Sequence, residues 1–321
     1  MINLPQENIN KLAAIPDSVN YTSISEKIND ILQKADNGYE FKAVEFTGYG
    51  GKDVRSLLKD VYQKCVYCEN TSGEFNTEHY RPKTEVRQFD GDKTTEVKDS
   101  NDRKHPGYYW LTYEMSNLLW VCALCNKGEG GKHGKFPTKN GFIFKHSINK
   151  ADWKVDSSVL LAEQPLLLHP LVDKPEEHLK VNFDGKLLPI KNSEKGDMTI
   201  KVCNLNRDTL WRDERKKIID NIFKNIHVQI NALTEIEKKD VEILVNEKGT
   251  EPLYHYFQKT CFSCIGENKK WSNKFSSVYR AIYNDFKLFL ENSEINKIIN
   301  DTEKIFLINA FEWYKKKNES V

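Results

Sequence analysis

The spacing of apolar and polar positions predicts helices near both ends of the chain. Residues 22–36 carry four aliphatic side chains at helical spacing and stop at Asn37-Gly38, a pair that commonly ends a helix. Residues 52–63 repeat this spacing and lead directly into a cysteine pair. After Leu210 the helical pattern dominates, and two stripes over 211–233 and 275–290 place apolar side chains largely at i, i+3, i+4 and i+7. We interpret these stripes as core.

The middle of the chain carries extended and irregular signals instead. Residues 141–144, Gly-Phe-Ile-Phe, predict a strand, and residues 181–187 predict a hairpin that turns at Asp184-Gly185. Residues 84–104 are rich in Asp, Lys, Glu and Thr, contain the turn signal Asp90-Gly91 and offer few apolar side chains. We expect this segment to be a mobile insertion.

Composition limits the class of protein. The chain has 321 residues, 39% of them hydrophobic, which is enough for one large core or two smaller ones. The first residues lack a charged and apolar leader, and no apolar run reaches the length of a membrane span. We therefore expect a cytoplasmic protein without membrane contact. Seven cysteines are too few and too clustered for a disulfide scaffold.

Four of these cysteines form two Cys-x-x-Cys pairs, Cys65/Cys68 and Cys122/Cys125. Two such pairs supply four soft ligands, which suit a tetrahedral Zn²⁺ ion. A set of four thiolates leaves no open position for a substrate, so the predicted zinc is structural. The remaining three cysteines, Cys203, Cys261 and Cys264, favour buried thiols over a second metal site, although the role of these three stays open.

Between the two pairs lie groups that could hold a second, catalytic metal ion. Glu78 is a hard oxygen ligand for Mg²⁺ or Mn²⁺, and Asn126 follows the second pair at once and can complete the site. His79 is next to Glu78 and can accept a proton from water. Asn117 can tether this region and orient His79. An isolated Glu-His pair is usually an ordinary surface feature, so the combination with the thiol pairs carries the prediction.

At these residues the chain resembles the HNH endonuclease family, whose catalytic unit is a ββα-metal fold. The resemblance implies that Glu78 and Asn126 bind the catalytic ion, that His79 is the general base and that Asn117 is the orienting residue. Two positions depart from the commoner family pattern. The acid is Glu instead of Asp, and the last motif residue is Asn instead of His.

A closer likeness joins the chain to the PtuB-type HNH subunit of Septu and retron-linked anti-phage defence systems. It covers about residues 52–216, and the motifs that carry it are Lys64–Glu69, Glu78–Lys83, Gly107–Leu111, Asn117–Leu119, Phe136–Pro137, Pro165–Pro170 and Leu205–Arg207. This resemblance implies a partner, an ABC or SMC-like ATPase that controls the nuclease.

A basic segment follows the second cysteine pair. Residues 127–154 contain seven lysines against Glu129 and Asp152, a net charge of +5 in a chain whose total is only +1. Such a local patch can hold phosphates beside the candidate site. The predicted nucleic-acid-binding residues are Arg81, Lys83, Lys127, Lys132, His133 and Lys135. His133 is also the alternative candidate for the role of Asn126 at the end of the motif. We favour DNA as the substrate, with tRNA or another RNA as the alternative.

These observations predict a helix-rich α+β protein with a zinc-braced ββα-metal core. The expected divisions are an N-terminal helical region at 1–60, the nuclease core at 61–150, a mixed extension at 151–210 and a C-terminal helical region at 211–321. The rival hypothesis is a non-catalytic zinc module that binds nucleic acid or protein. Such a module needs the cysteines but not Glu78, His79 and Asn126 together.

Overall fold

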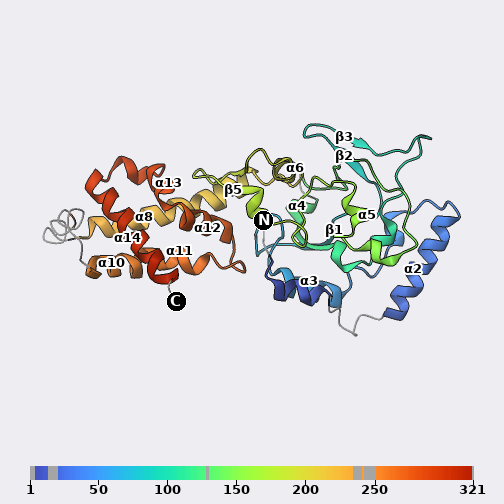
Figure 1. Cartoon of the computed structure of the whole chain (residues 1–321), viewed down its shortest axis with the longest axis horizontal. Coiled ribbons are helices and arrows are strands. Elements are labelled where there is room, and N and C mark those ends of the chain that lie inside the picture. Colours follow the sequence, from blue (N-terminus) through green and yellow to red (C-terminus); the bar gives the residue numbers. More distant parts are fainter. Residues whose placement is uncertain (1–3, 14–20, 128–129, 234–240, 242–250, 320–321) are drawn as a thin grey trace. The chain divides into compact units, whose positions relative to one another are not determined.

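A computed structural model describes residues 4–13, 21–127, 130–233, 241 and 251–319, without the side chains of 21–23 and 251 (Figure 1). The chain forms two compact units: Met1–Leu179 with Leu188–Asn206, and Lys180–Leu187 with Arg207–Val321. Among the described residues, strands occur only in three two-stranded sheets, and helices make up most of the rest. The predicted helix-rich α+β class is confirmed, whereas the finer divisions at residues 60, 150 and 210 stay predictions.

The first unit is organised around strands β1 (Phe75–His79) and β4 (Leu118–Cys122). They pair antiparallel, with Phe75 opposite Cys122 and His79 opposite Leu118. Because neighbouring side chains of a strand point to opposite sides, Glu78 and His79 leave β1 on different faces. The short helix α4 (Ala123–Asn126) begins directly after β4. Every residue of β4 is buried, so this strand lies inside the unit.

Helix α3 (Lys52–Tyr62) packs against this strand pair. It buries Val54, Leu58 and Val61, which the sequence places on one helical face. Helix α1 (Gln6–Ala13) packs on α3, and the Asn8 side-chain amide donates to the carbonyl of Val61 at 2.7 Å. Helix α2 (Tyr21–Asp36) ends where Asn37-Gly38 predicts. The predicted helices over 22–36 and 52–63 are thus confirmed.

The rest of the first unit consists of short elements. They are η1 (Ala43–Glu45), β2 (Arg87–Phe89), β3 (Thr94–Glu96), η2 (Tyr109–Leu111), η3 (Met115–Asn117), η4 (Lys150–Trp153), α5 (Ser158–Leu161), η5 (Pro175–Glu177) and α6 (Glu194–Val202). Strands β5 (Leu179–Val181) and β6 (Leu187–Pro189) form the hairpin that the sequence predicts around Asp184-Gly185. Leu179 of β5 and Leu188 and Pro189 of β6 belong to the first unit, and the remaining residues of both strands belong to the second.

Two expectations about irregular segments are wrong. Residues 84–104 contain the antiparallel hairpin β2–β3, which turns at the predicted Asp90-Gly91 and buries Val86, Phe89 and Val97. Those three apolar side chains are enough to anchor the hairpin. Residues 141–144 form no strand. Ile143 gives its backbone N–H to the Glu163 carboxylate at 2.8 Å, and its carbonyl meets His105 Nε2 at 3.0 Å, so side chains replace a partner strand.

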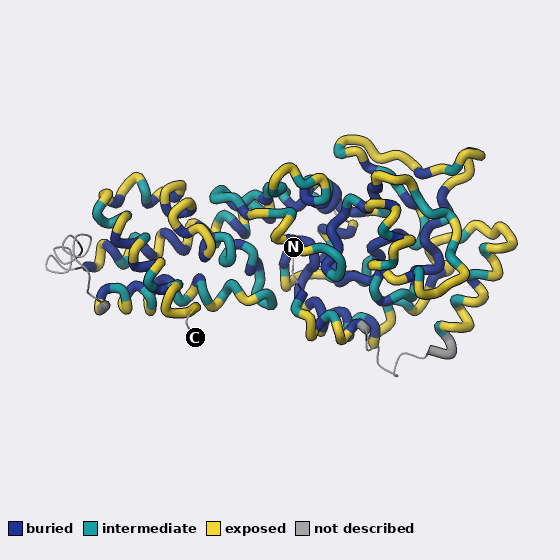
Figure 2. Tube along the Cα trace, viewed as in Figure 1, coloured by how far each residue is buried: buried dark blue, intermediate teal, exposed yellow. Residues whose placement is uncertain are grey.

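The second unit is helical wherever the structure describes it beyond residue 206, apart from connecting turns. Its elements are α7 (Asp208–Leu210), the π-helical η6 (Trp211–Lys216), α8 (Lys217–Asn231), α10 (Glu251–Phe257), the π-helical η7 (Gln258–Phe262), α11 (Ser263–Asn268), α12 (Ser276–Asn284), α13 (Phe286–Glu291), η8 (Glu294–Lys297) and α14 (Asp301–Glu319). Phe286 and Phe311 stack in its core with ring centroids 4.2 Å apart. Buried residues gather inside each unit (Figure 2), which confirms that the two apolar stripes are core.

No helix in the described part of the chain is both long and apolar enough to cross a membrane.

Buried histidines of the first unit, His105 and His169 among them, make its stability depend on pH. His105 Nδ1 accepts the N–H of Gly107 at 3.0 Å, and His169 Nδ1 accepts the N–H of Leu171 at 3.1 Å. Nδ1 of each ring must therefore be unprotonated, and the folded state favours the neutral imidazole. Burial lowers the pKa of His105 from 6.5 to about 4 and that of His169 to about 3. Between these values and 6.5 the unfolded chain binds more protons than the folded one.

We therefore predict that stability is full above pH 6.5 and falls as the pH drops below it. The loss is at most about 1.4 kcal/mol per pH unit for each histidine. Thermal unfolding between pH 7.5 and pH 5 measures the loss of stability, and NMR titration of the histidine rings shows whether His105 and His169 cause it. Titration of both buried rings near pH 6.5 in the folded protein would contradict this account.

Candidate active site and metal centre

The four predicted thiols meet at one point. The Sγ atoms of Cys65, Cys68, Cys122 and Cys125 all lie within 4.8 Å of one another, and all four residues are buried. Cys68 Sγ and Cys122 Sγ are 3.6 Å apart, close to the ~3.8 Å that a tetrahedral ion with metal–sulfur bonds of about 2.3 Å requires. This cluster can hold a metal ion and is compatible with structural zinc.

Local hydrogen bonds shape the first cysteine pair. The Cys65 N–H donates to the Asn70 carbonyl at 2.9 Å, and the Glu69 N–H donates back to the Cys65 carbonyl at 3.0 Å. Glu69 takes a positive φ of 66° to close this turn. Its carboxylate lies 3.4 Å from the Lys64 ammonium, and both side chains are buried. A buried charge needs such a partner, so the ion pair fixes the turn.

The second pair is positioned by strand pairing. Cys122 ends β4 and Cys125 lies in α4, so the strand-to-helix turn brings both thiols to the end of the sheet. The Ala123 N–H donates to the Glu74 carbonyl at 2.9 Å, which extends the β1–β4 contact by one more bond. The two cysteine pairs, more than 50 positions apart in sequence, therefore meet because β1 and β4 pair.

Within the described residues, this cluster is the one set of three or more metal-ligating side chains close enough to share an ion. Cys203 and Cys261 are buried and Cys264 is exposed. His255 packs edge-on against the Trp313 ring at 4.8 Å. The sequence-based expectation of buried thiols is thus confirmed for two of these three cysteines.

Glu78, His79 and Asn126 line one common hollow of about 520 Å³. Strand β1 supplies Glu78 and His79, and α4 supplies Asn126. Of the predicted nucleic-acid-binding residues, Lys83, Lys127 and His133 line the same hollow. Its charged side chains are four cations, Arg55, Lys83, Arg87 and Lys127, against two carboxylates, Glu78 and Glu85. An excess of positive charge favours an anionic ligand here.

His79 contacts a backbone acceptor and an aromatic ring. Its Nε2 lies 3.0 Å from the carbonyl of Thr112, and its ring lies 4.5 Å from the Tyr49 ring. Burial, and then the charge of Lys83, lowers the pKa of His79 from 6.5 to about 3, so the imidazole is neutral near pH 7. A neutral ring that donates from Nε2 to Thr112 keeps a lone pair on Nδ1.

Glu78 forms an ion pair with Lys132. The Lys132 ammonium lies 2.9 Å from Glu78 Oε1 and donates to the His79 carbonyl at 2.8 Å. Lys132 is fully buried, whereas 15% of the Glu78 side chain stays exposed. One carboxylate oxygen thus faces a fixed positive charge while the group as a whole still reaches the hollow.

Asn117 ties β4 to the segment that follows β1. Its side-chain oxygen accepts the Arg81 N–H at 2.8 Å, and its amide donates to the carbonyls of Arg81 and Leu111 at 3.1 and 3.2 Å. The backbone continues this contact, since the Tyr80 N–H donates to the Asn117 carbonyl at 2.8 Å. Asn117 therefore holds the chain immediately after His79 and does not line the hollow.

Two of the predicted phosphate contacts are wrong. Arg81 has no exposed surface, and its guanidinium binds the Glu163 carboxylate at 2.9 Å and the Leu160 carbonyl at 2.7 Å. Lys132 is equally buried against Glu78. Both cations are needed inside the unit, where Arg81 compensates the buried Glu163 and Lys132 compensates the partly exposed Glu78. Lys135 is half-buried, donates to the Gly131 carbonyl at 3.0 Å and does not itself line the hollow.

Sequence reasoning missed several residues of this site. Tyr49, Arg55 and Arg87 line the hollow, and Thr112 supplies the acceptor for His79. They come from four separate segments, and none belongs to a motif with a recognisable spacing. The only available signal was the helical face of α3, on which Arg55 lies among other basic residues.

Comparisons with known proteins give two relatives. Septu protein PtuB from Bacillus mycoides (strain KBAB4) is 33% identical over 224 residues, which cover 68% of this chain and 67% of that protein. Septu protein PtuA from the same strain is 32% identical over 151 residues, 46% of this chain. The chain spans only 18% of PtuA, so this second likeness concerns a small part of that protein. No family model and no solved structure matches the chain.

Replacing Cys68 or Cys122 by serine is expected to remove the bound metal and destabilise the first unit. Structural zinc contributes about 10 to 16 kcal/mol in small zinc-binding units, and a loss of only about 3 kcal/mol lowers the Tm of a unit of this size by roughly 10 °C. Elemental analysis and thermal unfolding measure both effects. Cys264→Ser, at an exposed cysteine, is the matched control. Well-folded wild-type protein without any bound metal would refute the prediction.

Proposed function

Because the chain belongs to the PtuB family of Septu defence proteins, we propose that it is the nuclease of such a system, an HNH endonuclease that uses one divalent cation. The observation that carries the proposal is the common hollow of Glu78, His79 and Asn126, directly beside the thiol cluster. A structural zinc module has no use for this second set of groups. DNA is the proposed substrate, and tRNA is the alternative to be tested beside it.

In this proposal His79 is the general base. Its neutral ring is in the form that accepts a proton, and the Nε2 contact with Thr112 at 3.0 Å directs the free lone pair of Nδ1 away from that carbonyl. Asn117 supports the base indirectly, because it fixes the backbone of Arg81 just beyond it. The attacked phosphate would lie in the hollow among Lys83, Lys127 and His133.

Glu78 and Asn126 are the proposed ligands of the catalytic cation, Mg²⁺ or Mn²⁺. Carboxylate and amide oxygens are the donors that such hard ions prefer, and both side chains line the hollow. When bound, the ion would neutralise charge on the phosphate and stabilise the leaving oxygen. Lys132 already compensates Glu78 Oε1, so the ion would share this carboxylate with an ammonium group, which weakens its binding.

We further propose that an ABC or SMC-like ATPase controls this nuclease. The proposal rests on the family, in which PtuB and PtuA both carry the Septu name. Cleavage of plasmid DNA and of total tRNA, with and without the candidate ATPase, in Mg²⁺ and in Mn²⁺, tests the substrate, the metal and the partner together. Cleavage of neither substrate under any of these conditions would favour the non-catalytic binding module.

The variant His79→Ala is expected to lower the cleavage rate by about 10² to 10⁴, the usual loss when a positioned base is removed. Its metal content should stay near that of the wild type, because His79 does not belong to the thiol cluster, and loss of the buried ring should lower the Tm by only a few degrees. Single-turnover cleavage measures the rate, and His227→Ala, in helix α8, is the matched control. Full activity of the His79 variant would discredit the HNH assignment.

The variants Glu78→Gln and Asn126→Ala are expected to raise the Mg²⁺ concentration at half-maximal activity roughly 10- to 100-fold, since each removes an oxygen donor or its charge. High Mg²⁺ or Mn²⁺ should restore part of the rate, whereas it should not rescue His79→Ala. A metal titration of the cleavage rate makes the comparison. Glu177→Gln, at an exposed carboxylate, is the control, and unchanged metal dependence in Glu78→Gln would rule out its role as a ligand.

A further inference from the structure

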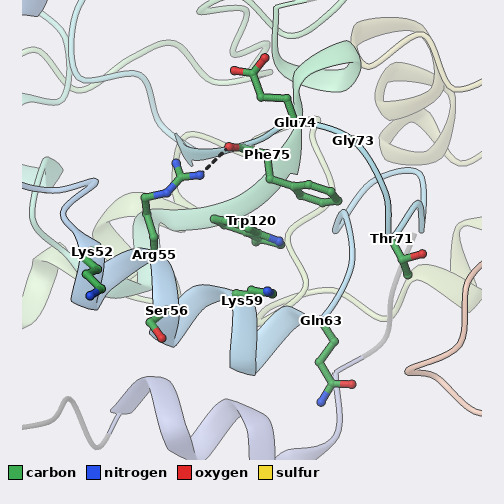
Figure 3. A pocket seen from close by; sticks show the side chains of 10 residues that line it. All are labelled: Lys52, Arg55, Ser56, Lys59, Gln63, Thr71, Gly73, Glu74, Phe75 and Trp120. Atoms are coloured by element: carbon green, nitrogen blue, oxygen red, sulfur yellow. Dashed lines mark hydrogen bonds between the residues drawn. The ribbon is translucent and has the colours of Figure 1, made fainter.

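A second hollow, of about 490 Å³, lies between helix α3 and the loop that follows the first cysteine pair (Figure 3). Helix α3 lines it with Lys52, Ser56 and Lys59, and the loop lines it with Thr71 and Gly73. None of these residues belongs to the thiol cluster or to the candidate active site. The volume lies in the range of pockets that hold small ligands.

Aromatic rings and a fixed guanidinium form the inner wall of this hollow. Phe75 of β1 and Trp120 of β4 stack with ring centroids 5.2 Å apart and planes at 12°. The Arg55 guanidinium lies 5.1 Å from the centre of the Trp120 ring and donates to the Phe75 carbonyl at 2.9 Å (Figure 3). Two contacts therefore hold Arg55 in one orientation, and its charge is built into the wall.

The charge of the lining is predominantly positive. Lys52, Arg55 and Lys59 recur at i, i+3 and i+7, so they share one face of α3, and Glu74 is the acidic residue among the lining side chains. Asp60, also on α3, pairs with Lys11 at 3.2 Å and does not line the hollow. In a chain with a net charge of only +1, three cations against one carboxylate make a local anion-binding surface.

This hollow continues into the candidate active site. Arg55 lines both hollows. Among the consecutive residues of β1, Phe75 lines the hollow beside α3, and Asn76 to His79 line the hollow of the candidate active site. A polyanionic strand with one phosphate beside His79 can therefore continue past Arg55 without leaving positively charged surface. Binding of a small free anion would not require the two hollows to be joined by positively charged surface.

We propose that the hollow of Lys52, Arg55 and Lys59 binds a nucleotide of a single-stranded substrate, adjacent to the one that is cleaved. The proposal rests on the proposed nuclease function and names its substrate class. Phosphates would lie against Lys52 and Lys59, and the sugar and base would lie along the Phe75–Trp120 wall. Basic grooves with aromatic walls are the usual means of binding single strands without sequence preference. A pocket of this size takes one nucleotide, whereas a duplex would have to remain outside it.

The test measures binding separately from cleavage. Fluorescence anisotropy with a short labelled single-stranded DNA, without added Mg²⁺ or Mn²⁺, compares the full-length wild type with Lys52→Ala/Lys59→Ala and with the uncharged filling variant Ser56→Trp. The control is Lys34→Ala/Lys174→Ala, at two exposed lysines of the same unit that line neither hollow. The same DNA as a duplex, and free ATP as a competitor, are the other two probes.

We expect both hollow variants to weaken single-strand binding about tenfold and the control to bind like the wild type. The logarithm of the association constant decreases linearly with the logarithm of the salt concentration. This slope should become less negative by about 0.7 for each phosphate that the double lysine variant no longer neutralises. Unchanged binding in both hollow variants would overturn the proposal. Equal binding of the duplex with the same weakening in the variants, or displacement of the strand by ATP at equal phosphate concentration, would also overturn it.

A parallel cleavage assay separates this proposal from the nuclease assignment. Metal-dependent cleavage by the wild type together with unchanged binding in the hollow variants would remove the hollow from the substrate path and leave the nuclease intact. Absence of metal-dependent cleavage by the wild type, both with and without the candidate ATPase and despite binding that the hollow variants weaken, would overturn the nuclease assignment and support the hollow as a strand-binding site.

Discussion

The pairing of β1 with β4 is the constraint on which the first unit depends. Each strand has only five residues, and an isolated two-stranded sheet of this size is marginal in water. The structure supports it at both ends, with the four thiols beyond Phe75 and Cys122 and with Asn117 beyond His79. Because a shift of one residue would exchange the faces of Glu78 and His79, these two anchors also set the geometry of the candidate site.

Buried charges connect this strand pair to the rest of the unit. Arg81 follows β1 and binds Glu163, whose carboxylate also accepts from Tyr108 at 2.6 Å and from the Ile143 N–H. Removing any one partner would leave the others with an uncompensated charge or an unpaired donor, which costs several kcal/mol. The segment around Glu163 is thus a structural support of the site, although it contributes no residue to the hollow.

Sequence reasoning predicted the features that depend on local spacing and missed those that depend on distant partners. The cysteine spacing predicted the thiol cluster, and helical periodicity predicted α2, α3 and the helices of the second unit. The burial of Arg81 could not be predicted, because its partner Glu163 lies 82 positions away. Residues 141–144 have the composition of a strand, but a strand forms only beside another edge, and here side chains satisfy the backbone of Ile143.

Lys132 couples the thiol cluster to the candidate catalytic groups. Its backbone N–H donates to the Cys125 carbonyl at 3.0 Å, and its ammonium reaches Glu78 Oε1 at 2.9 Å and the His79 carbonyl at 2.8 Å. A change in the position of Cys125 would therefore move the charge that compensates Glu78. Since a buried ammonium without its carboxylate is costly, the cluster and the end of β1 stabilise each other. The thiol cluster thus contributes to the electrostatics of the hollow without lining it.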